Sequence, residues 1–281
     1  MPRPLALLGA MVIATAVPAA ELAQVVQRRD ADFAAGVPLV AHVVVALCDN
    51  EHQGIVPVAA SLGNGSDPKS NLYWGAMYGV RTWFRHSREW TPVAVAPAKD
   101  VRVLDRALFR REVVRDGRRG EVYLLADAWD GRYIAEATRY FLEMNRGDHV
   151  ERVQTGSRTL EAGGGAHVTA YIGHNGLMDF EAPTLPMSTI APPAHASVVL
   201  ACISDSYFAP LLREHSVPLL TTTGLMAPEA YTLDAALTSW FSGGGTGEAR
   251  IAAARAYAHY QRTSEQAALR LFRSGSGTER P

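Results

Sequence analysis

The sequence predicts a three-layer α/β sandwich built around a mostly parallel central sheet. Short apolar runs typical of buried strands alternate along the chain with amphipathic segments, and glycine and proline residues separate the two kinds of segment. Strands connected through helices in this way run parallel, with right-handed crossovers. The chain has 281 residues, 48% of them hydrophobic, which is enough to form one large core.

Five apolar runs are expected to form the sheet. The first, 40–47, is a valine-rich and nearly continuous run, which is typical of a strand covered on both faces. The other four are 121–126, 168–172, 197–203 and 217–222. Between and after them, apolar residues return every three to four positions, which predicts helices. These helical segments are 71–84, 132–144, 231–241 and 248–266, with a short helix through Leu211 and Leu212.

The two ends of the chain are expected to lie outside the folded domain. Residues 1–19 have the pattern of a signal peptide, with Arg3 before an apolar, uncharged run and a Val-Pro-Ala triplet at its end. The run is shorter than the ~20 residues of a membrane span, although a buried N-terminal helix is an alternative. The domain would then cover 25–273, and 274–281 would be a disordered tail. We therefore expect an exported protein, periplasmic or secreted, that has no membrane association after cleavage.

The charge and the cysteine content of the chain argue against nucleic-acid binding and against a disulfide-stabilised fold. Lys and Arg number 27 and Asp and Glu number 28, so the formal net charge is -1 and nothing marks the chain as a nucleic-acid binder. The chain has only two cysteines, Cys48 and Cys202, which is too few for a disulfide framework. A single bridge between them remains an alternative, and it would block any thiol chemistry.

Polar or reactive side chains follow every predicted strand. In parallel sheets the reactive groups collect at the carboxyl ends of the strands. The third predicted strand is followed by His174, and the fourth contains Cys202 near its end. Neighbouring strands lie ~4.8 Å apart, so the imidazole would be close enough to accept the thiol proton. The sequence therefore favours His174 and Cys202 as a catalytic pair.

The segments that carry this pair resemble the caspase-like cysteine peptidases, which include caspases, legumain and gingipain-like enzymes, and most of all the legumain branch. In this family one strand ends in His-Gly and the next in Ala-Cys or Gly-Cys, with a serine soon after. The matching segments here are VTAYIGHNGLMDF (168–180) and SVVLACISDSYF (197–208). More weakly, VVVALCDNEHQG (43–54) and PLLTTTGLMAPEAY (218–231) resemble loops on either side. One departure is Asn175, which precedes the expected glycine.

The resemblance implies a caspase/legumain-like fold and hydrolysis of peptide bonds through a thioester. His174 would be the general base, Cys202 the nucleophile, and Asn50 the side chain that orients the imidazole. The amides at Gly176 and Cys202 would form the oxyanion hole. Substrate-binding residues on the surrounding loops would be Asp49, His52, Ser204, Thr223 and Glu229. The expected partner is a peptide or protein substrate, and this chemistry requires no metal and no organic cofactor.

Two other functions remain open from the sequence. A metal-dependent hydrolase would use acidic and imidazole groups at the strand ends, with Asp49, Glu51, His52, Asp127, Asp130 and His174 as candidate ligands. No HExxH or CxxC spacing supports it. Alternatively, a catalytically inactive caspase-like fold would act as a ligand- or protein-binding module, and the aromatic-rich segment 71–84 would supply a binding surface.

Overall fold

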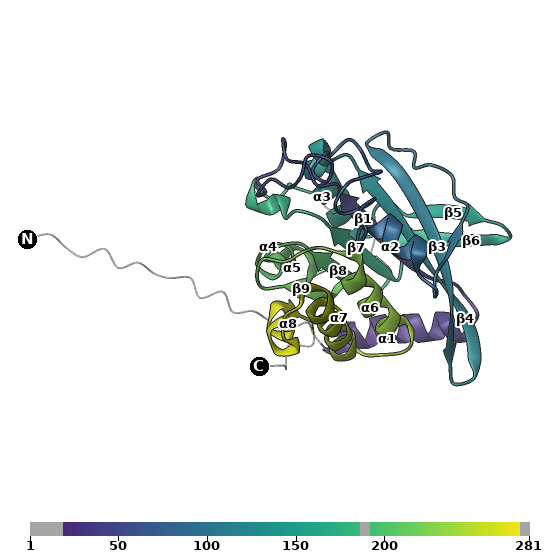
Figure 1. Cartoon of the computed structure of the whole chain (residues 1–281). Coiled ribbons are helices and arrows are strands. Elements are labelled where there is room, and N and C mark those ends of the chain that lie inside the picture. Colours follow the sequence, from purple (N-terminus) through teal and green to yellow (C-terminus); the bar gives the residue numbers. More distant parts are fainter. Residues whose placement is uncertain (1–18, 186–191, 276–281) are drawn as a thin grey trace, which may run out of the picture.

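The structure, a computed structural model, describes residues 19–185 and 192–275. The protein is α/β, with a mixed sheet of eight strands flanked by helices, an architecture compatible with a three-layer sandwich (Figure 1). The strand order is β10-β9-β8-β7-β1-β4-β3-β2, and β5 and β6 form a separate two-stranded sheet. The predicted signal peptide lies outside the described residues except for Ala19, and so does most of the predicted tail.

Five parallel strands form the centre of the large sheet. They are β1 (Leu39–Ala46), β4 (Arg118–Trp129), β7 (Val168–Ile172), β8 (Ala196–Leu200) and β9 (Val217–Thr222). Side by side in the sheet their order is β4-β1-β7-β8-β9, so the chain passes from β1 to β4 on one side and then returns to β7 on the other side of β1. The direction of the strand order therefore reverses at β1, which makes the carboxyl end of β1 a topological switch point, where open α/β sheets bind ligands.

The remaining strands are antiparallel, and the sequence analysis did not predict them. They are β2 (Thr91–Val93), β3 (Val103–Arg115), β5 (Glu151–Thr155), β6 (Arg158–Ala162) and β10 (Phe272–Arg273). β3 carries four arginines and is largely half-exposed, so it lacks the apolar run by which the buried strands were identified. A tight turn joins β3 to β4, where Asp116 and Gly117 both have positive φ, as two-residue hairpin turns require.

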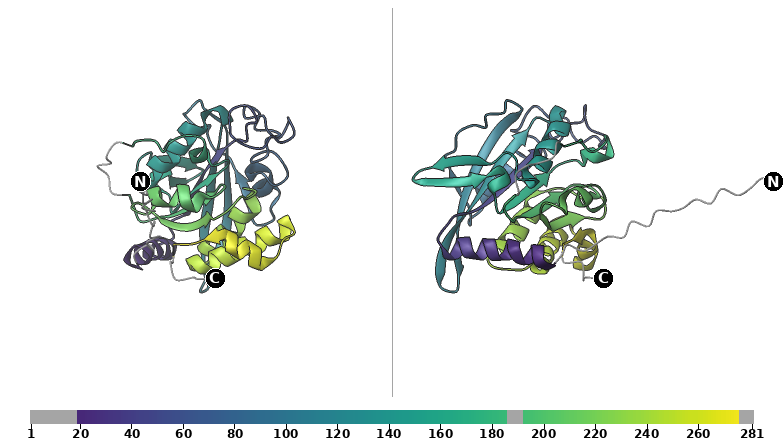
Figure 2. Two further views of the ribbon diagram at one scale, coloured as in Figure 1. Left: turned by 90° about the vertical axis from the view of Figure 1, so that its left-hand side faces the viewer. Right: turned by 180° about the vertical axis from the view of Figure 1, so that it is seen from behind.

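Helices cover both faces of the sheet (Figure 2). One face is covered by α1 (Ala19–Ala34), α2 (Val80–His86), α6 (Ala230–Phe241), α7 (Thr246–Gln261) and α8 (Glu265–Leu271). The other is covered by α3 (Ile134–Asn145), α4 (Ser204–Tyr207) and α5 (Ala209–Leu212). Three short 3-10 turns are η1 (Gly131–Tyr133), η2 (Gly163–Gly165) and η3 (Gly176–Met178). Val43 and Val45 of β1 pack in the first core and Val44 in the second, as expected from alternating side chains.

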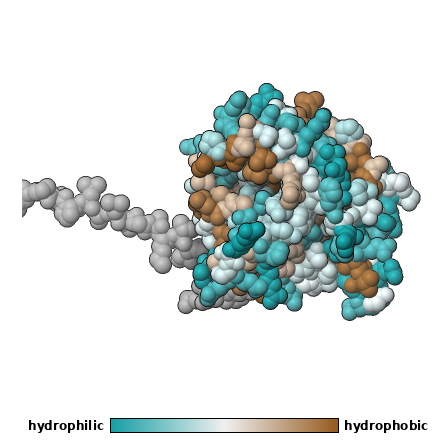
Figure 3. All heavy atoms as spheres, in the orientation of Figure 1, coloured by the Kyte–Doolittle hydropathy of each residue, from teal (hydrophilic) through white to brown (hydrophobic). Residues whose placement is uncertain are grey.

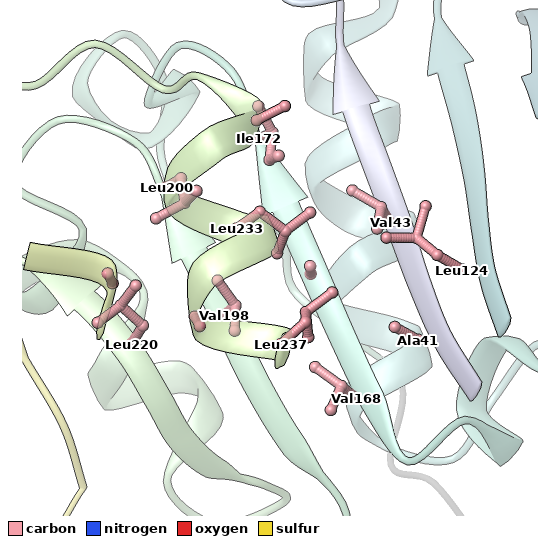
Figure 4. Close-up of a cluster of buried hydrophobic side chains, with 14 of the residues drawn as sticks. Ala41, Val43, Leu124, Val168, Ile172, Val198, Leu200, Leu220, Leu233 and Leu237 are labelled. Carbon is pink, nitrogen blue, oxygen red and sulfur yellow. The ribbon is translucent and has the colours of Figure 1, made fainter. Parts of the chain in front are cut away.

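The larger core lies between α6 and the parallel strands. Figure 4 shows Leu233 and Leu237 of α6 in front of the strands, near Val198 and Leu200 of β8 and Ile172 of β7. All five side chains are fully buried. Because burying one such side chain contributes roughly 1.5–3 kcal/mol, this layer fixes the positions of β7 and β8 and of the loops that follow them.

Several predicted elements have different bounds in the structure, and three of these differences matter for the site or the topology. The predicted helix over 71–84 is wrong in its first half, since α2 begins at Val80 and 71–79 form turns. The buried Asn71 amide bonds the backbone of Cys48 and Tyr73, which holds the chain in this non-helical path. The segment 248–266 divides into α7 and α8 at Arg262, which has a positive φ. The fourth strand ends at Leu200 rather than 203.

Helix α1 is part of the folded domain and extends it to residues before the predicted start at 25. The Arg29 side chain is almost fully buried, donates hydrogen bonds to the carbonyls of Trp240 and Gly244, and lies 4.2 Å from the centre of the Trp240 ring. Arg28 donates to three more carbonyls, those of Gly165, Ala166 and Ala194. Within 19–185 and 192–275, no helix combines the length and the apolar character needed to cross a bilayer.

Candidate active site at the strand ends

The loops that follow β7 and β8 lie side by side. The two strands pair in parallel with Ile172 opposite Leu200, so His174 and Cys202 both come two residues after this matched pair. The loops are bonded directly, because the Asn175 side-chain amide donates to the Cys202 carbonyl at 2.6 Å. The structure thus brings the two predicted residues to adjoining strand ends of one sheet.

The His174 imidazole is held by a carboxylate that the sequence analysis did not single out. Its Nε2 lies 2.8 Å from Oδ2 of Asp179, and the same oxygen accepts the Gly54 N–H at 2.8 Å. His174 is only 8% exposed. A carboxylate on one ring nitrogen fixes the tautomer and leaves the other nitrogen to accept a proton. Asp179 was recognisable only as the acidic residue of the GHNGLMDF segment, on the turn that Asn175 caps through the Leu177 N–H.

The Cys202 thiol is half-buried and free. Its sulfur accepts the Met226 N–H at 3.4 Å and lies 3.7 Å from the carbonyl oxygen of the same residue. Both backbone polar groups of Met226 therefore lie against the thiol. The next residue, Ile203, has φ 52°, a left-handed conformation that is strained for a β-branched side chain. Such strain costs about 1–3 kcal/mol and concentrates at functional sites.

In the described part of the chain, no hydrogen bond joins the His174 imidazole to the Cys202 thiol. His174 bonds Asp179, whereas the thiol bonds the backbone of Met226. Catalytic hydrogen bonds are often long in structures without substrate and shorten when substrate binds. The structure therefore places an imidazole and a free thiol on neighbouring loops, without a hydrogen bond between them.

The two amides expected at the oxyanion hole differ in their surroundings. The Gly176 N–H donates to the His174 carbonyl at 3.1 Å, so it is already used within the loop. A Cβ at Gly176 would lie 2.6 Å from the ring of Phe180, so this glycine is needed for close packing. The Cys202 N–H has no hydrogen-bond partner among the residues described.

Asn50 does not contact His174 but holds its own loop. Its side-chain oxygen accepts the Val58 N–H at 3.0 Å, and its amide nitrogen donates to the Val58 carbonyl at 2.9 Å. A Cβ at Gly63 would overlap the Asn50 side chain, so the pocket around it is closely filled. The side chain that is hydrogen-bonded to the His174 ring is thus Asp179 and not Asn50.

Ser204 and Asp49, two of the expected substrate-binding residues, form hydrogen bonds with the backbone of their own and neighbouring segments. Ser204 is fully buried, and its hydroxyl donates to the Val199 carbonyl and accepts the Thr222 N–H, both at 2.9 Å. Asp49 is 4% exposed and caps the turn after β1 by accepting the Glu51 N–H at 2.8 Å. Both side chains are thus almost fully buried and are engaged in hydrogen bonds within the protein.

The other three expected substrate-binding residues are accessible. His52 is exposed and bonds Asp49 through Nδ1 at 2.9 Å. Thr223 is exposed, with its hydroxyl on the Arg270 carbonyl. Glu229 is half-buried and accepts the Tyr231 hydroxyl at 2.6 Å. His52 lies on the loop after β1, whereas Thr223 and Glu229 lie on the loop between β9 and α6. No hydrogen bond in the described residues connects the three to His174 or Cys202.

The two cysteines are free and belong to different environments. They follow β1 and β8, which are separated by β7, so two strand spacings place their Cα atoms ~9.6 Å apart. A disulfide requires less than ~7 Å, so a bridge would need the backbone to move. Burial raises the pKa of the Cys48 thiol to about 11, although a hydrogen bond with Tyr73 opposes this. Cys48 is therefore a core thiol of low reactivity.

The candidate metal ligands pair with other side chains instead of meeting at one point. Asp127 bonds His42 and Arg106, and Asp130 bonds Arg132. Across the residues that the structure describes, His, Cys, Asp and Glu form no group of three or more that could hold a metal ion. The metal-hydrolase alternative therefore finds no ligand set in this part of the chain.

One exposed apolar side chain, Leu225, directly precedes the residue that contacts the thiol, and it is 74% exposed. Figure 3 shows apolar groups as separate brown patches on a largely hydrophilic face.

Comparison with known proteins found no match to this chain among protein-family models, curated proteins or solved structures. A proposal about function therefore depends on the geometry of the strand ends.

Proposed function

We propose that this protein is a cysteine peptidase of the caspase-like type, with Cys202 as nucleophile and His174 as general base. The observation that carries the proposal is the register of β7 and β8, which sets the two residues at equivalent positions on adjoining strand ends. The order of histidine before cysteine and the Ala201-Cys202 pair agree with the caspase/legumain resemblance. The free thiol and its Met226 amide donor support the same assignment.

The first half of the proposed reaction forms a thioester. Because Nε2 of His174 bonds Asp179, Nδ1 is the nitrogen that accepts the thiol proton. The sulfur then bonds the carbonyl carbon of the substrate, and the Cys202 N–H donates to the developing oxyanion. The carbon–nitrogen bond breaks as His174 returns its proton to the leaving amine.

The second half releases the acid. His174 takes a proton from water, the hydroxide bonds the thioester carbon, and the carbon–sulfur bond breaks. The proton returns to the sulfur, so the enzyme is regenerated and one water is consumed per peptide bond. Throughout, Asp179 stabilises the imidazolium that forms twice in each cycle.

A labelling experiment tests the proposal. The full chain is incubated with peptidyl acyloxymethyl ketones that differ in the residue before the electrophile, and adducts are located by peptide mass spectrometry. We expect one adduct, on Cys202, that is lost in Cys202→Ala and strongly slowed in His174→Ala. Cys48→Ala is the matched control and keeps the label.

The outcomes separate the proposal from a binding role. Equal labelling of both cysteines, or labelling that ignores His174, contradicts catalysis by this pair. Protection of Cys202 by a peptide that is never cleaved would instead favour the inactive, ligand-binding alternative. Export is a separate proposal, since the predicted signal peptide lies outside the described residues. It is tested by determining the N-terminus of the mature protein in the extracytoplasmic fraction, where a start near Ala19 is expected.

A further inference from the structure

A cavity of about 740 Å³ lies between α3, β3, β4 and the start of β5. Small-molecule sites commonly measure ~300–1,000 Å³. The cavity is on the α3 side of the sheet, whereas the Cys202 thiol bonds Met226, which packs against the core on the opposite side. None of the residues proposed above for the peptidase reaction lines it.

The floor of this cavity is a fixed network of buried charges. The Arg106 side chain is 6% exposed and donates to both oxygens of Asp127, at 2.6 and 2.8 Å, and to both oxygens of Glu151. Behind it, His42 Nδ1 accepts the Gly163 N–H and Nε2 bonds Asp127. Because Nδ1 is an acceptor, the ring donates from Nε2. A floor whose groups are all bonded presents a rigid surface to a ligand.

One wall of the cavity is aromatic. The Tyr140 ring lies 5.1 Å from the ring of Trp129 and 4.7 Å from that of His149, measured between centroids. Burial and the nearby carboxylates of Asp127 and Glu151 raise the pKa of the Tyr140 hydroxyl, so it remains protonated. In the described residues this hydroxyl has no hydrogen-bond partner. It is therefore a donor left over after the protein's own contacts are made.

The lining of the cavity has no net charge, but it has more free hydrogen-bond donors than free acceptors. Five Lys or Arg residues and five Asp or Glu residues line it, so the lining has no net charge. Within the described ranges, Lys99 has no partner and Arg139 has only an ion pair with Glu143 at 3.8 Å. Glu136 is the carboxylate without a hydrogen bond there. Free donors thus outnumber free acceptors.

We propose that this cavity binds a neutral polyhydroxylated molecule, a monosaccharide unit free or at the end of a glycan. A hydroxyl group offers one donor and two acceptor lone pairs, which matches a lining with more free donors than acceptors. Zero net charge gives no gain to an anionic or cationic ligand. The partly exposed His149 ring, at the outer edge of the aromatic wall, suits the apolar C–H face of a sugar ring. The proposal does not depend on the peptidase chemistry.

The test uses the full chain and four neutral sugars: glucose, galactose, mannose and N-acetylglucosamine. Binding is measured by saturation-transfer NMR and by the rise in melting temperature. We expect at least one sugar to bind, with affinity about tenfold lower in Tyr140→Phe, which removes only the hydroxyl, and reduced in Glu136→Gln. Tyr207→Phe, an exposed tyrosine elsewhere, is the matched control and leaves binding unchanged.

Several outcomes would overturn the proposal. The first is that none of the four sugars binds. The second is that Tyr140→Phe and Glu136→Gln both bind sugar as tightly as the unmodified protein. The third is that glucuronate, glucose 6-phosphate or glycine binds more tightly than the neutral sugars. Cys202→Ala is expected to bind sugar as the unmodified protein does. The sugar-binding result can therefore be interpreted even if the peptidase proposal fails.

Discussion

Lowering the pH from about 7.5 to about 5 is expected to destabilise the protein through His195, at the amino end of β8. This side chain is 1% exposed. Its Nδ1 donates to the Pro193 carbonyl at 2.9 Å. In this neutral form Nε2 carries no proton, so its position 3.3 Å from Oδ1 of Asn145 is not a hydrogen bond. Burial, reinforced by the positive charge of Arg28, lowers the pKa of His195 to about 4. The folded protein therefore keeps this ring neutral where an unfolded chain protonates it.

The size of the effect follows from proton linkage. A histidine with a pKa near 6.5 in the unfolded chain and about 4 in the folded protein lowers the free energy of unfolding as the pH falls below 6.5. Since each pKa unit corresponds to ~1.36 kcal/mol, the loss between pH 7.5 and 5 is about 2 kcal/mol. His167, at the start of β7, adds to it, because burial also lowers its pKa to about 4.

The assay is urea unfolding at a series of pH values, followed by tryptophan fluorescence. We compare the pH dependence of the unfolding free energy in the unmodified protein with that in His195→Gln, which can still donate to Pro193. The variant is expected to lose about 2 kcal/mol less between pH 7.5 and 5. The matched control is His86→Gln, an exposed residue on α2, which leaves the pH dependence unchanged. If His195→Gln and the unmodified protein show the same pH dependence, the reasoning is refuted.

Three further predictions concern the core and the thiols. Asp127→Asn leaves the buried Arg106 side chain short of a charged partner and should lower the free energy of unfolding by about 3–5 kcal/mol in urea. Leu237→Ala in the α6 core should cost about 2–5 kcal/mol, whereas Leu225→Ala, 74% exposed, should change stability by less than ~0.5 kcal/mol. Iodoacetamide should modify Cys202 well before Cys48 at neutral pH, measured by peptide mass, and equal rates would contradict the burial of Cys48.

The buried parallel strands could be predicted from the sequence because both of their faces are covered. The runs 168–172 and 217–222 coincide with β7 and β9 at both ends. Strand β3, which lies between β4 and the edge strand β2, could not be found in this way, since its arginines form ion pairs such as those of Arg106 with Asp127 and Glu151. These partners come from β4 and β5, so the reason for the arginines appears only in three dimensions.

The candidate site could also be predicted only in part from the sequence. His174 and Cys202 could be placed because strand ends mark the reactive edge of a parallel sheet. Asp179 could not, since its contact with His174 depends on how η3 turns the chain back and on the Gly54 N–H from a distant loop. Ser204 was expected at the substrate, but its fully buried hydroxyl joins β8 to β9.

The two proposed sites share one sheet but use different sides of it, which allows them to be tested separately. The thiol of Cys202 bonds Met226, and Met226 packs in the core that contains α6. Tyr140 and Trp129 pack in the core that contains α3. Effects of substitutions that share no partners are generally additive. A double variant of Cys202→Ala and Tyr140→Phe should therefore lose labelling and sugar binding to the same extents as the two single variants. Coupling between the two losses would mean that the sheet transmits a conformational change from one site to the other.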